Sequence, residues 1–276
     1  MIFCCCIRGD TLSVVIGITN NKGGCGKTSL MTNLIGVITS AESAKVLQID
    51  LDGQGNAADA CGLPEARMTT ADVLNGKISL SGAKKEVNPF LDVLQAGDSM
   101  STFEFDILPM LKRYDNPFGI LKPHIDQVRT KYDYIFIDTP PSLSLLVGNT
   151  FLASDHILIP FVPEPDSVKG FKRVVETIGD FNQAGNKINI LSVVPMMVES
   201  RTTVHSDILQ QARRYCDENN ITIWDGVIPR SVYVPKARAY ERKPATLGKM
   251  RNTEAIKAYY DLWDFLSDKI KEGQKP

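Results

Sequence analysis

Long apolar segments are missing from this sequence of 276 residues. The longest charge-free stretch, Thr139 to Ser154, contains two prolines and is shorter than the roughly 20 residues that a membrane-spanning helix requires. The apolar residues 1–6 are followed at once by Arg8 and Asp10, so we expect no secretory signal there. With 43% apolar and 23% charged residues, the composition is typical of a globular protein, which we expect in the cytoplasm.

Paired cysteines and clustered histidines are missing as well. The chain has six cysteines and three histidines, and no two cysteines have the C-x-x-C spacing. Three cysteines are adjacent at positions 4–6, which excludes a disulfide framework built from them. The isolated residues are Cys25, Cys61, Cys216, His124, His156 and His205. This pattern disfavours a metal or iron–sulfur centre built from these side chains.

Short β-rich runs alternate with helical stretches along the chain. The expected strands are Ser13–Thr19, Lys45–Asp50, Leu91–Gln95, Tyr134–Asp138, His156–Phe161, Ile188–Val194 and Ile221–Trp224. Several are continuous Val, Ile, Leu or Phe runs, which is typical of strands buried on both faces of a parallel sheet. The expected helices are Thr28–Ser40, Thr70–Leu74, Leu108–Lys131 (broken around Pro117 and Pro123), Ser142–Ala153, Ser167–Ala184, Val204–Asn219 and Thr253–Lys271.

This alternation predicts an α/β fold with a doubly wound, mostly parallel sheet flanked by helices, and ligands at the carboxyl ends of the strands. No repeat or long linker interrupts the chain. We therefore expect one domain over residues 13–271, a poorly ordered extension over residues 1–12 and a tail over residues 272–276.

A phosphate-binding loop is the strongest signal in the sequence. The apolar run Val14–Ile18 leads into Asn21-Lys22-Gly23-Gly24-Cys25-Gly26-Lys27-Thr28, and helical spacing follows from Ser29. Strand, glycine-rich turn, Gly-Lys-Thr and helix form a layout in which backbone N–H groups and a helix N-terminus surround phosphates. Lys27 would contact the β- and γ-phosphates, and the Thr28 hydroxyl would bind Mg²⁺. The pattern predicts a nucleoside triphosphate with Mg²⁺ as ligand.

A second lysine distinguishes this loop from the ordinary motif. The ordinary pattern has glycine where this chain has Asn21, and Lys22 precedes the glycine pair. The form Lys-Gly-Gly-x-Gly-Lys-Thr resembles the deviant Walker A motif of the ParA/MinD family of dimerising P-loop ATPases, and the chain is most similar to Soj-like ParA partition ATPases. The resemblance implies that ATP contacts residues 22–29 and that Lys22 reaches the phosphates bound by a partner subunit.

Two aspartates follow the second expected strand. Asp50 and Asp52 are spaced i, i+2 and therefore share a face in extended geometry. The segment Asp50-Leu51-Asp52-Gly53-Gln54-Gly55-Asn56 resembles the D-x-D-P-Q-G-N sequence of the family, with Gly53 in place of proline. The resemblance implies that Asp52 positions the attacking water and that Asp50 supports the metal through water. Without the resemblance, the segment is equally typical of a turn.

A further aspartate ends the strand Tyr134–Asp138 and precedes Thr139-Pro140-Pro141-Ser142. An apolar strand that ends in Asp is typical of a Walker B element, whose carboxylate contacts Mg²⁺ through a bound water. We therefore expect Asp138 and Thr28 to act together on the metal. A helix cap is the alternative role for an Asp at this place.

The resemblance spans roughly Ser13 to Lys271, and it weakens after Pro229 and Arg230, which it places near the adenine base. It implies a weakly active ATP hydrolase that forms ADP and phosphate, with Lys22, Lys27 and Asp52 as catalytic residues. The ATP-bound form would be a homodimer that binds DNA without sequence preference. A ParB-like centromere-binding protein would stimulate hydrolysis.

Positive charge gathers near the C-terminal end. Overall the chain has a net charge of −1, but residues 228–251 hold seven basic residues and one acid. Such a patch is typical of contact with phosphate backbones. The candidate DNA contacts are Arg201, Arg213, Arg214, Lys236, Arg238, Arg242, Lys243, Lys249 and Arg251. A solvated charged face is the alternative.

These motifs leave the purpose of the ATPase open. The leading hypothesis is partition of plasmid or chromosomal DNA by a nucleoid-associated protein. The alternatives are a MinD-like membrane-cycling ATPase, a factor that positions a protein cargo, and a scaffold that does not hydrolyse ATP. A MinD-like protein needs a basic amphipathic tail, whereas the tail here carries Asp261, Asp264 and Asp268 among its apolar residues. We therefore expect this helix to pack on the domain rather than on anionic lipid.

Overall fold

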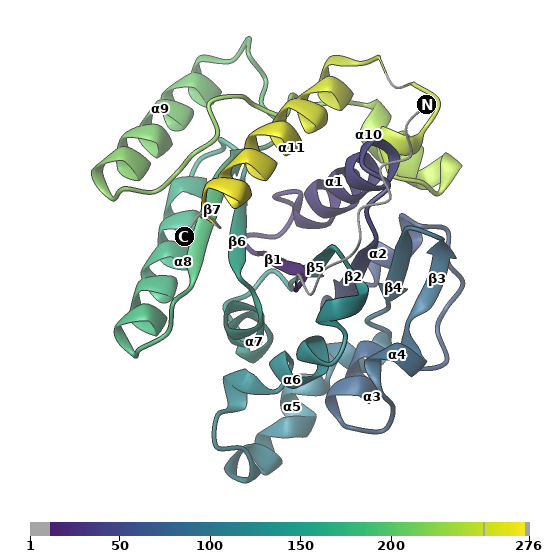
Figure 1. The fold of residues 1–276 in the computed structure, drawn as a ribbon. Coiled ribbons are helices and arrows are strands. Elements are labelled where there is room, and N and C mark those ends of the chain that lie inside the picture. Colours follow the sequence, from purple (N-terminus) through teal and green to yellow (C-terminus); the bar gives the residue numbers. More distant parts are fainter. Residues whose placement is uncertain (1–11, 251, 274–276) are drawn as a thin grey trace.

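The computed structural model describes residues 12–250 and 252–273 (Figure 1). The expectations for residues 1–11, for Arg251 and for residues 274–276 lie outside the described part. Within it, a central sheet has the strand order β3-β4-β2-β5-β1-β6-β7. The strands are β1 Val14–Ile18, β2 Val46–Asp50, β3 Lys85–Asn88, β4 Leu91–Leu94, β5 Tyr134–Asp138, β6 His156–Phe161 and β7 Asn189–Pro195.

The sheet confirms the predicted doubly wound, mostly parallel class. All neighbouring strands pair in parallel except β3, which runs antiparallel to β4 at one edge. The sequence analysis missed β3 because its residues Lys85 and Glu86 are exposed and give no buried apolar run. A strand at the edge of a sheet pairs on one side only, so it can form without a buried apolar run.

Helices cover both faces of the sheet (Figure 1). On β1, Ile16 belongs to the core under α1 and α11, whereas Val15 belongs to the core under α3, α4 and α7. The helices are α1 Lys27–Ala41, α2 Asn56–Asp59, α3 Thr70–Leu74, α4 Leu80–Ala83, α5 Phe103–Ile107, α6 Lys122–Asp126, α7 Leu145–Ala153, α8 Ser167–Gln183, α9 Thr203–Glu218, α10 Tyr233–Lys236 and α11 Glu254–Gly273.

Three predicted elements differ from the structure. The helix expected over Leu108–Lys131 is replaced by short 3₁₀ turns and the brief α6, because Pro109, Pro117 and Pro123 interrupt the helical hydrogen bonds. The strand expected over Ile221–Trp224 is only a bridge between Val193 and Ile223, after which the chain turns away at Asp225-Gly226. The predicted helix at Ser142–Ala153 begins three residues later, at Leu145, because Pro140 and Pro141 precede it.

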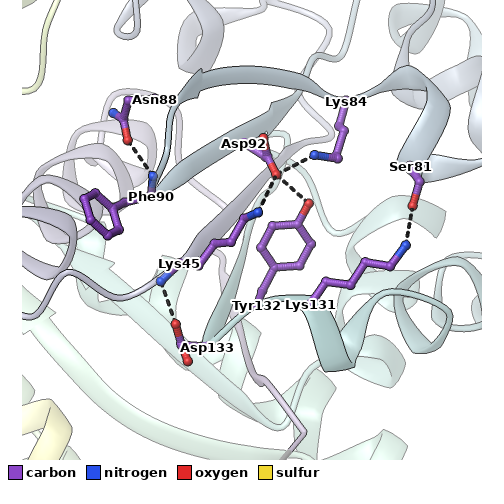
Figure 2. A network of polar contacts seen from close by, with 9 residues as sticks. All are labelled: Lys45, Ser81, Lys84, Asn88, Phe90, Asp92, Lys131, Tyr132 and Asp133. Carbon is purple, nitrogen blue, oxygen red and sulfur yellow. Dashed lines mark hydrogen bonds and ion pairs between the residues drawn. The ribbon is translucent and has the colours of Figure 1, made fainter. Parts of the chain in front are cut away.

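A polar network fastens the edge strands at the amino-terminal end of the sheet (Figure 2). The Asp92 carboxylate on β4 is buried and accepts hydrogen bonds from Lys84 Nζ at 2.6 Å and Tyr132 Oη at 2.7 Å. Lys45 Nζ lies 4.0 Å from the same oxygen. A buried carboxylate is tolerated only when it is paired in this way. The network therefore ties β3 and β4 to the segments before β2 and β5, at the end opposite Asp50.

The terminal helix α11 packs on the domain, as predicted. Tyr259, Leu262 and Leu266 are buried against α1, and Trp263 Nε1 donates to Glu42 Oε1 at 2.7 Å. Its apolar stripe is therefore already covered. None of the helices in the described part of the chain combines the length and apolarity needed to span a lipid bilayer.

Candidate nucleotide site

The three segments that the sequence analysis selected follow three adjacent strands. In the sheet order, β5 lies between β2 and β1, and Asp50 pairs in register with Asp138, which pairs with Ile18. Parallel strands end at the same edge, so the loops after Ile18, Asp50 and Asp138 meet there. The structure therefore brings the glycine-rich loop and all three aspartates together.

The glycine-rich loop is shaped by left-handed backbone at two glycines. Gly24 has φ +73° and Gly26 has φ +86°, values that residues with a Cβ rarely adopt. Gly26 is the N-cap of the 15-residue helix α1, and no side chain caps this helix end. The first N–H groups of α1 are left for a ligand, and the positive end of the helix dipole favours an anion there.

Lys27 is a buried cation beside this loop. Its side chain is enclosed, and its Nζ lies 3.5 Å from the carbonyl oxygens of Asn20 and Lys22. No carboxylate in the described part of the chain forms an ion pair with it. A buried charge without an ionic partner is costly, so this arrangement fits a phosphate as the missing anion.

Thr28 and Asp138 are joined by a short hydrogen bond within the site. The Thr28 hydroxyl donates to Asp138 Oδ2 at 2.5 Å, while Oδ1 of this fully buried carboxylate has no partner among the described residues. Burial raises the pKa of Asp138 to about 7, against the opposing effects of the Thr28 hydrogen bond and the Lys27 charge. An orphaned carboxylate oxygen beside a hydroxyl fits a hard cation such as Mg²⁺, which prefers oxygen ligands.

Asp50 and Asp52 have different environments. Asp50 is fully buried, and its two oxygens accept the backbone N–H groups of Asp52 at 2.9 Å and Ala57 at 3.3 Å. Burial and the neighbouring Asp138 raise its pKa. Asp52 is half-buried, and Oδ1 accepts the Gln54 N–H at 3.1 Å. Asp50 therefore shapes the loop, and Asp52 is the carboxylate that solvent can reach.

A cavity of about 980 Å³ opens from the start of α1. One wall holds Gly26, Thr28 and Ser29, and the opposite wall is the segment 228–245, including Pro229 and Arg230. Three of the predicted phosphate contacts and both predicted base contacts thus line one cavity, large enough for a drug-sized ligand, whereas residues 22–25 and Lys27 do not line it. Arg230 Nη1 lies 3.0 Å from Glu199 Oε1 at this wall.

Several predicted DNA contacts already have protein partners. Arg238 donates to Asn56 Oδ1 and lies 3.9 Å from Asp59 Oδ2, which joins the second wall to the helix after Asp52. Arg213 Nη2 donates to the Asp225 carbonyl at 2.6 Å. The side chains that remain exposed are Arg201, Arg214, Lys236, Arg242, Lys243 and Lys249.

Two partners in this region were missed by sequence reasoning. Glu164 lies 2.8 Å from Lys22 Nζ, although 142 positions separate them. Asn56 Oδ1 accepts a hydrogen bond from Arg238, which lies 182 positions further along the chain. Both Glu164 and Asn56 lie inside segments that resemble the family, but no spacing rule links residues so far apart. Their proximity follows only from the order of the strands.

The loop after β1, the uncapped α1 and the Thr28–Asp138 pair define the class of P-loop nucleotide-binding proteins. A family model described as an AAA domain matches residues 13–190. The chain is 31% identical to the sporulation initiation inhibitor protein Soj of Bacillus subtilis, covering 90% of this chain and 96% of Soj. It is 31% identical to the chromosome partitioning protein ParA of Caulobacter vibrioides, covering 84% and 86%. The chain belongs to the ParA family of P-loop ATPases.

The fold is also similar to solved structures. Cobyrinic acid a,c-diamide synthase from Mycobacterium smegmatis, with bound ATP analogue and magnesium, superposes with a TM-score of 0.80 at 25% identity. The match covers 96% of this chain and 98% of that one. The synthase chemistry in that name belongs to that protein, because function resides in sites rather than in folds.

Proposed function

We propose that this chain is an ATPase that dimerises when it binds ATP and that partitions plasmid or chromosomal DNA. One observation carries the proposal: the buried cation Lys27 and the Thr28–Asp138 pair lie together at the start of α1, where Thr28 lines the cavity. The second lysine, Lys22, lies in the same glycine-rich loop. The relatives named for chromosome partitioning support the choice of DNA as cargo.

Hydrolysis in this site needs no covalent intermediate. Lys27 and the N–H groups of residues 23–29 bind and neutralise the phosphate oxygens. Thr28 and, through water, Asp138 and Asp50 hold the Mg²⁺, whose positive charge stabilises the phosphates. Asp52 holds the attacking water in line with the γ-phosphorus, and the products are ADP and phosphate. The segment at Pro229 and Arg230 positions the base.

Lys22 makes the dimer the competent form. It extends from the loop rather than into the phosphate cradle of its own subunit, because its Nζ contacts Glu164. In the proposed dimer, each Lys22 contacts the triphosphate bound by the other subunit, so loss of the γ-phosphate weakens the interface. This coupling makes ATP the signal for assembly and hydrolysis the signal for release.

The exposed cations of the second wall supply the DNA surface of that dimer. Residues 228–250 form part of the nucleotide cavity and carry four exposed cations, of which Arg242 and Lys243 line the cavity while Lys236 and Lys249 lie outside it. Such a surface binds phosphate backbones without reading sequence. We propose a cytoplasmic, nucleoid-associated protein whose turnover is stimulated by a ParB-like partner. A membrane-cycling role is not favoured, because the apolar face of α11 already packs on α1.

Two measurements test this function. Light scattering with a slowly hydrolysed ATP analogue and Mg²⁺ should give twice the monomer mass, and ADP should leave monomers. Duplex DNA should bind only with the analogue, and its affinity should fall by about ten-fold or more between 50 and 200 mM salt. Monomers at saturating analogue would refute the dimer, and salt-independent binding would refute the phosphate contact.

A further inference from the structure

Lys22 is held by a carboxylate of its own chain. Its Nζ lies 2.8 Å from Glu164 Oε2, and the side chains of Lys22 and Glu164 are 35% and 44% exposed. The hydrogen bond from Lys22 lowers the pKa of Glu164, with smaller contributions from the positive charges of Lys22 and Arg230. The two side chains therefore form an ion pair, close enough to the cavity-lining Arg230 for its charge to act on Glu164.

Glu164 is presented by a fixed loop between β6 and α8. Pro163 and Pro165 flank it, and its N–H donates to the Val162 carbonyl at 2.8 Å. Its own carbonyl accepts the Ser167 N–H at 3.1 Å and the Ser167 hydroxyl at 2.5 Å, at the first residue of α8. Proline restricts both Glu164 and its neighbours. The backbone that carries the Glu164 carboxylate is therefore restrained, whereas Lys22 lies in the glycine-rich loop.

The Lys22 ammonium cannot form complete contacts with Glu164 and with a nucleotide at the same time. In the proposed dimer it must leave a carboxylate of one negative charge for a triphosphate that carries several. A diphosphate lacks the terminal group and compensates the lost ion pair less well. An equilibrium shifts only by the difference in interaction energy between its two states. The ion pair thus increases the interaction energy that a nucleotide must supply to Lys22 before the dimer can form.

We infer that Glu164 is a positioning residue that retains Lys22 within its own subunit until a partner's triphosphate displaces it. This inference rests on the proposed function in one respect, the contact of Lys22 with the partner's nucleotide. The retention of Lys22 by Glu164 in the free chain is independent of it. Glu164 itself contacts no phosphate in this scheme, and its effect runs through Lys22 alone.

The expected effects are modest, because the pair is partly exposed. A pair of this kind contributes about a two- to five-fold change in an equilibrium constant. Two Lys22–Glu164 ion pairs break when a dimer forms, one in each subunit. Glu164→Gln should therefore tighten dimerisation by about four- to 25-fold. ADP-bound Glu164→Gln should then form dimers at concentrations where the wild type does not.

The first experiment uses the nucleotide-free chain. Reductive methylation followed by mass spectrometry measures how fast the Lys22 amine reacts, and Glu164→Gln should speed this reaction about two- to five-fold. Asp166→Asn is the matched control, because it removes one negative charge from the same loop and Asp166 pairs with Lys169 at 2.8 Å. An unchanged rate in Glu164→Gln, or an equal change in both variants, would overturn the retention of Lys22.

The second experiment compares dimer dissociation constants with the ATP analogue and Mg²⁺. Glu164→Gln should dimerise more tightly than the wild type and than Asp166→Asn, and in a Lys22→Gln background the same substitution should have no effect. Weaker dimerisation of Glu164→Gln would show that Glu164 serves the closed dimer and would overturn the inference. If the wild type stays monomeric, the proposed function fails, while the methylation rates still decide whether Glu164 retains Lys22.

Discussion

The two walls of the nucleotide cavity are built differently. The first wall holds Gly26, Thr28 and Ser29 at the start of α1. Next to these residues, the functional side chains of Lys27, Asp50 and Asp138 are buried and do not line the cavity themselves. The second wall, residues 228–245, consists of short helical turns, including a π-helical turn over Ala237–Glu241, and carries exposed cations. The comparison suggests a rigid wall for the reaction and an adaptable wall for partners.

The walls meet at α1. The Thr246 N–H donates to Asn33 Oδ1 at 3.1 Å, and the Thr246 hydroxyl donates to the Asn33 carbonyl at 3.0 Å, both buried. Arg238 provides a second connection, to Asn56 and Asp59 on the other side of the cavity. A ligand that contacts both walls can therefore influence the conformation of each. If the first wall serves the reaction and the second wall binds partners, substitutions in one wall should leave the function of the other unchanged.

The largest effect is expected from Lys27→Ala in the first wall. The substitution removes a buried cation that faces the phosphates, so ATP affinity should fall by about 100-fold or more. Isothermal titration calorimetry measures this directly. The control is Lys169→Ala, which removes an exposed lysine that pairs only with Asp166 and should leave affinity unchanged. Equal affinities for wild type and Lys27→Ala would remove the first wall from the phosphate site.

The next effect concerns turnover rather than binding. Asp52→Ala should bind ATP and dimerise, because the hydrogen bond of the Asp52 side chain, to the Gln54 N–H, is local to its own loop. It should hydrolyse ATP about 100-fold more slowly, since positioning of the attacking water is lost. Phosphate release measures the rate, and a fluorescent ATP analogue measures binding. Turnover at the wild-type rate would assign the water to another residue.

The second wall is tested by the pair Lys236→Ala and Lys249→Ala, two exposed cations that do not line the cavity. The double variant should bind duplex DNA about ten-fold more weakly, with a salt slope reduced by about 2, and should keep its ATP affinity. The control removes two charges elsewhere, with Lys269→Ala and Lys271→Ala on α11. Similar losses of DNA affinity in both double variants would show that binding depends on the net charge of the protein rather than on this wall.

The same contrast explains what the sequence could predict. Residues 13–56 and 134–142 are recognisable because a phosphate cradle demands glycines, a lysine and strand-end carboxylates at fixed spacing. Six of the strands, β1, β2, β4, β5, β6 and β7, match their predicted runs to within one residue, since each consists mostly of buried residues. The short turns between 108 and 131 were predicted as a helix broken only around Pro117 and Pro123.

The second wall could be predicted only as a charged segment. The cations in and around this wall are alike in sequence, but Arg213 on α9 and Arg238 have partners within the protein. The ammonium groups of Lys236 and Lys249 form no ion pair with a carboxylate of the described residues. Which cations are engaged depends on loops brought together by the strand order. Glu164 was missed for the same reason. Long-range ion pairs leave no periodic pattern in a single sequence.

The smallest expected effect is a pH dependence within the first wall. Burial raises the pKa of Asp138 to about 7, above its value of 3.8 in the unfolded chain, so the protonated form favours the ligand-free fold. This stabilisation is complete below pH 3.8 and is lost as the pH rises through about 7. Ligand-free protein should therefore lose about 1 kcal/mol, or about 2–4 °C in Tm, between pH 6 and 8.

Magnesium should reverse that trend, because it binds the deprotonated carboxylate. With nucleotide and Mg²⁺, the gain in Tm should grow from pH 6 to pH 8 as fewer protons have to be displaced. Asp138→Asn removes the titrating group while Thr28 keeps an acceptor oxygen, so its Tm without ligand should change less over the same range. Differential scanning calorimetry at both pH values separates the cases. An identical pH profile in Asp138→Asn and wild type would place the titrating group elsewhere and would leave the first wall without its proposed metal carboxylate.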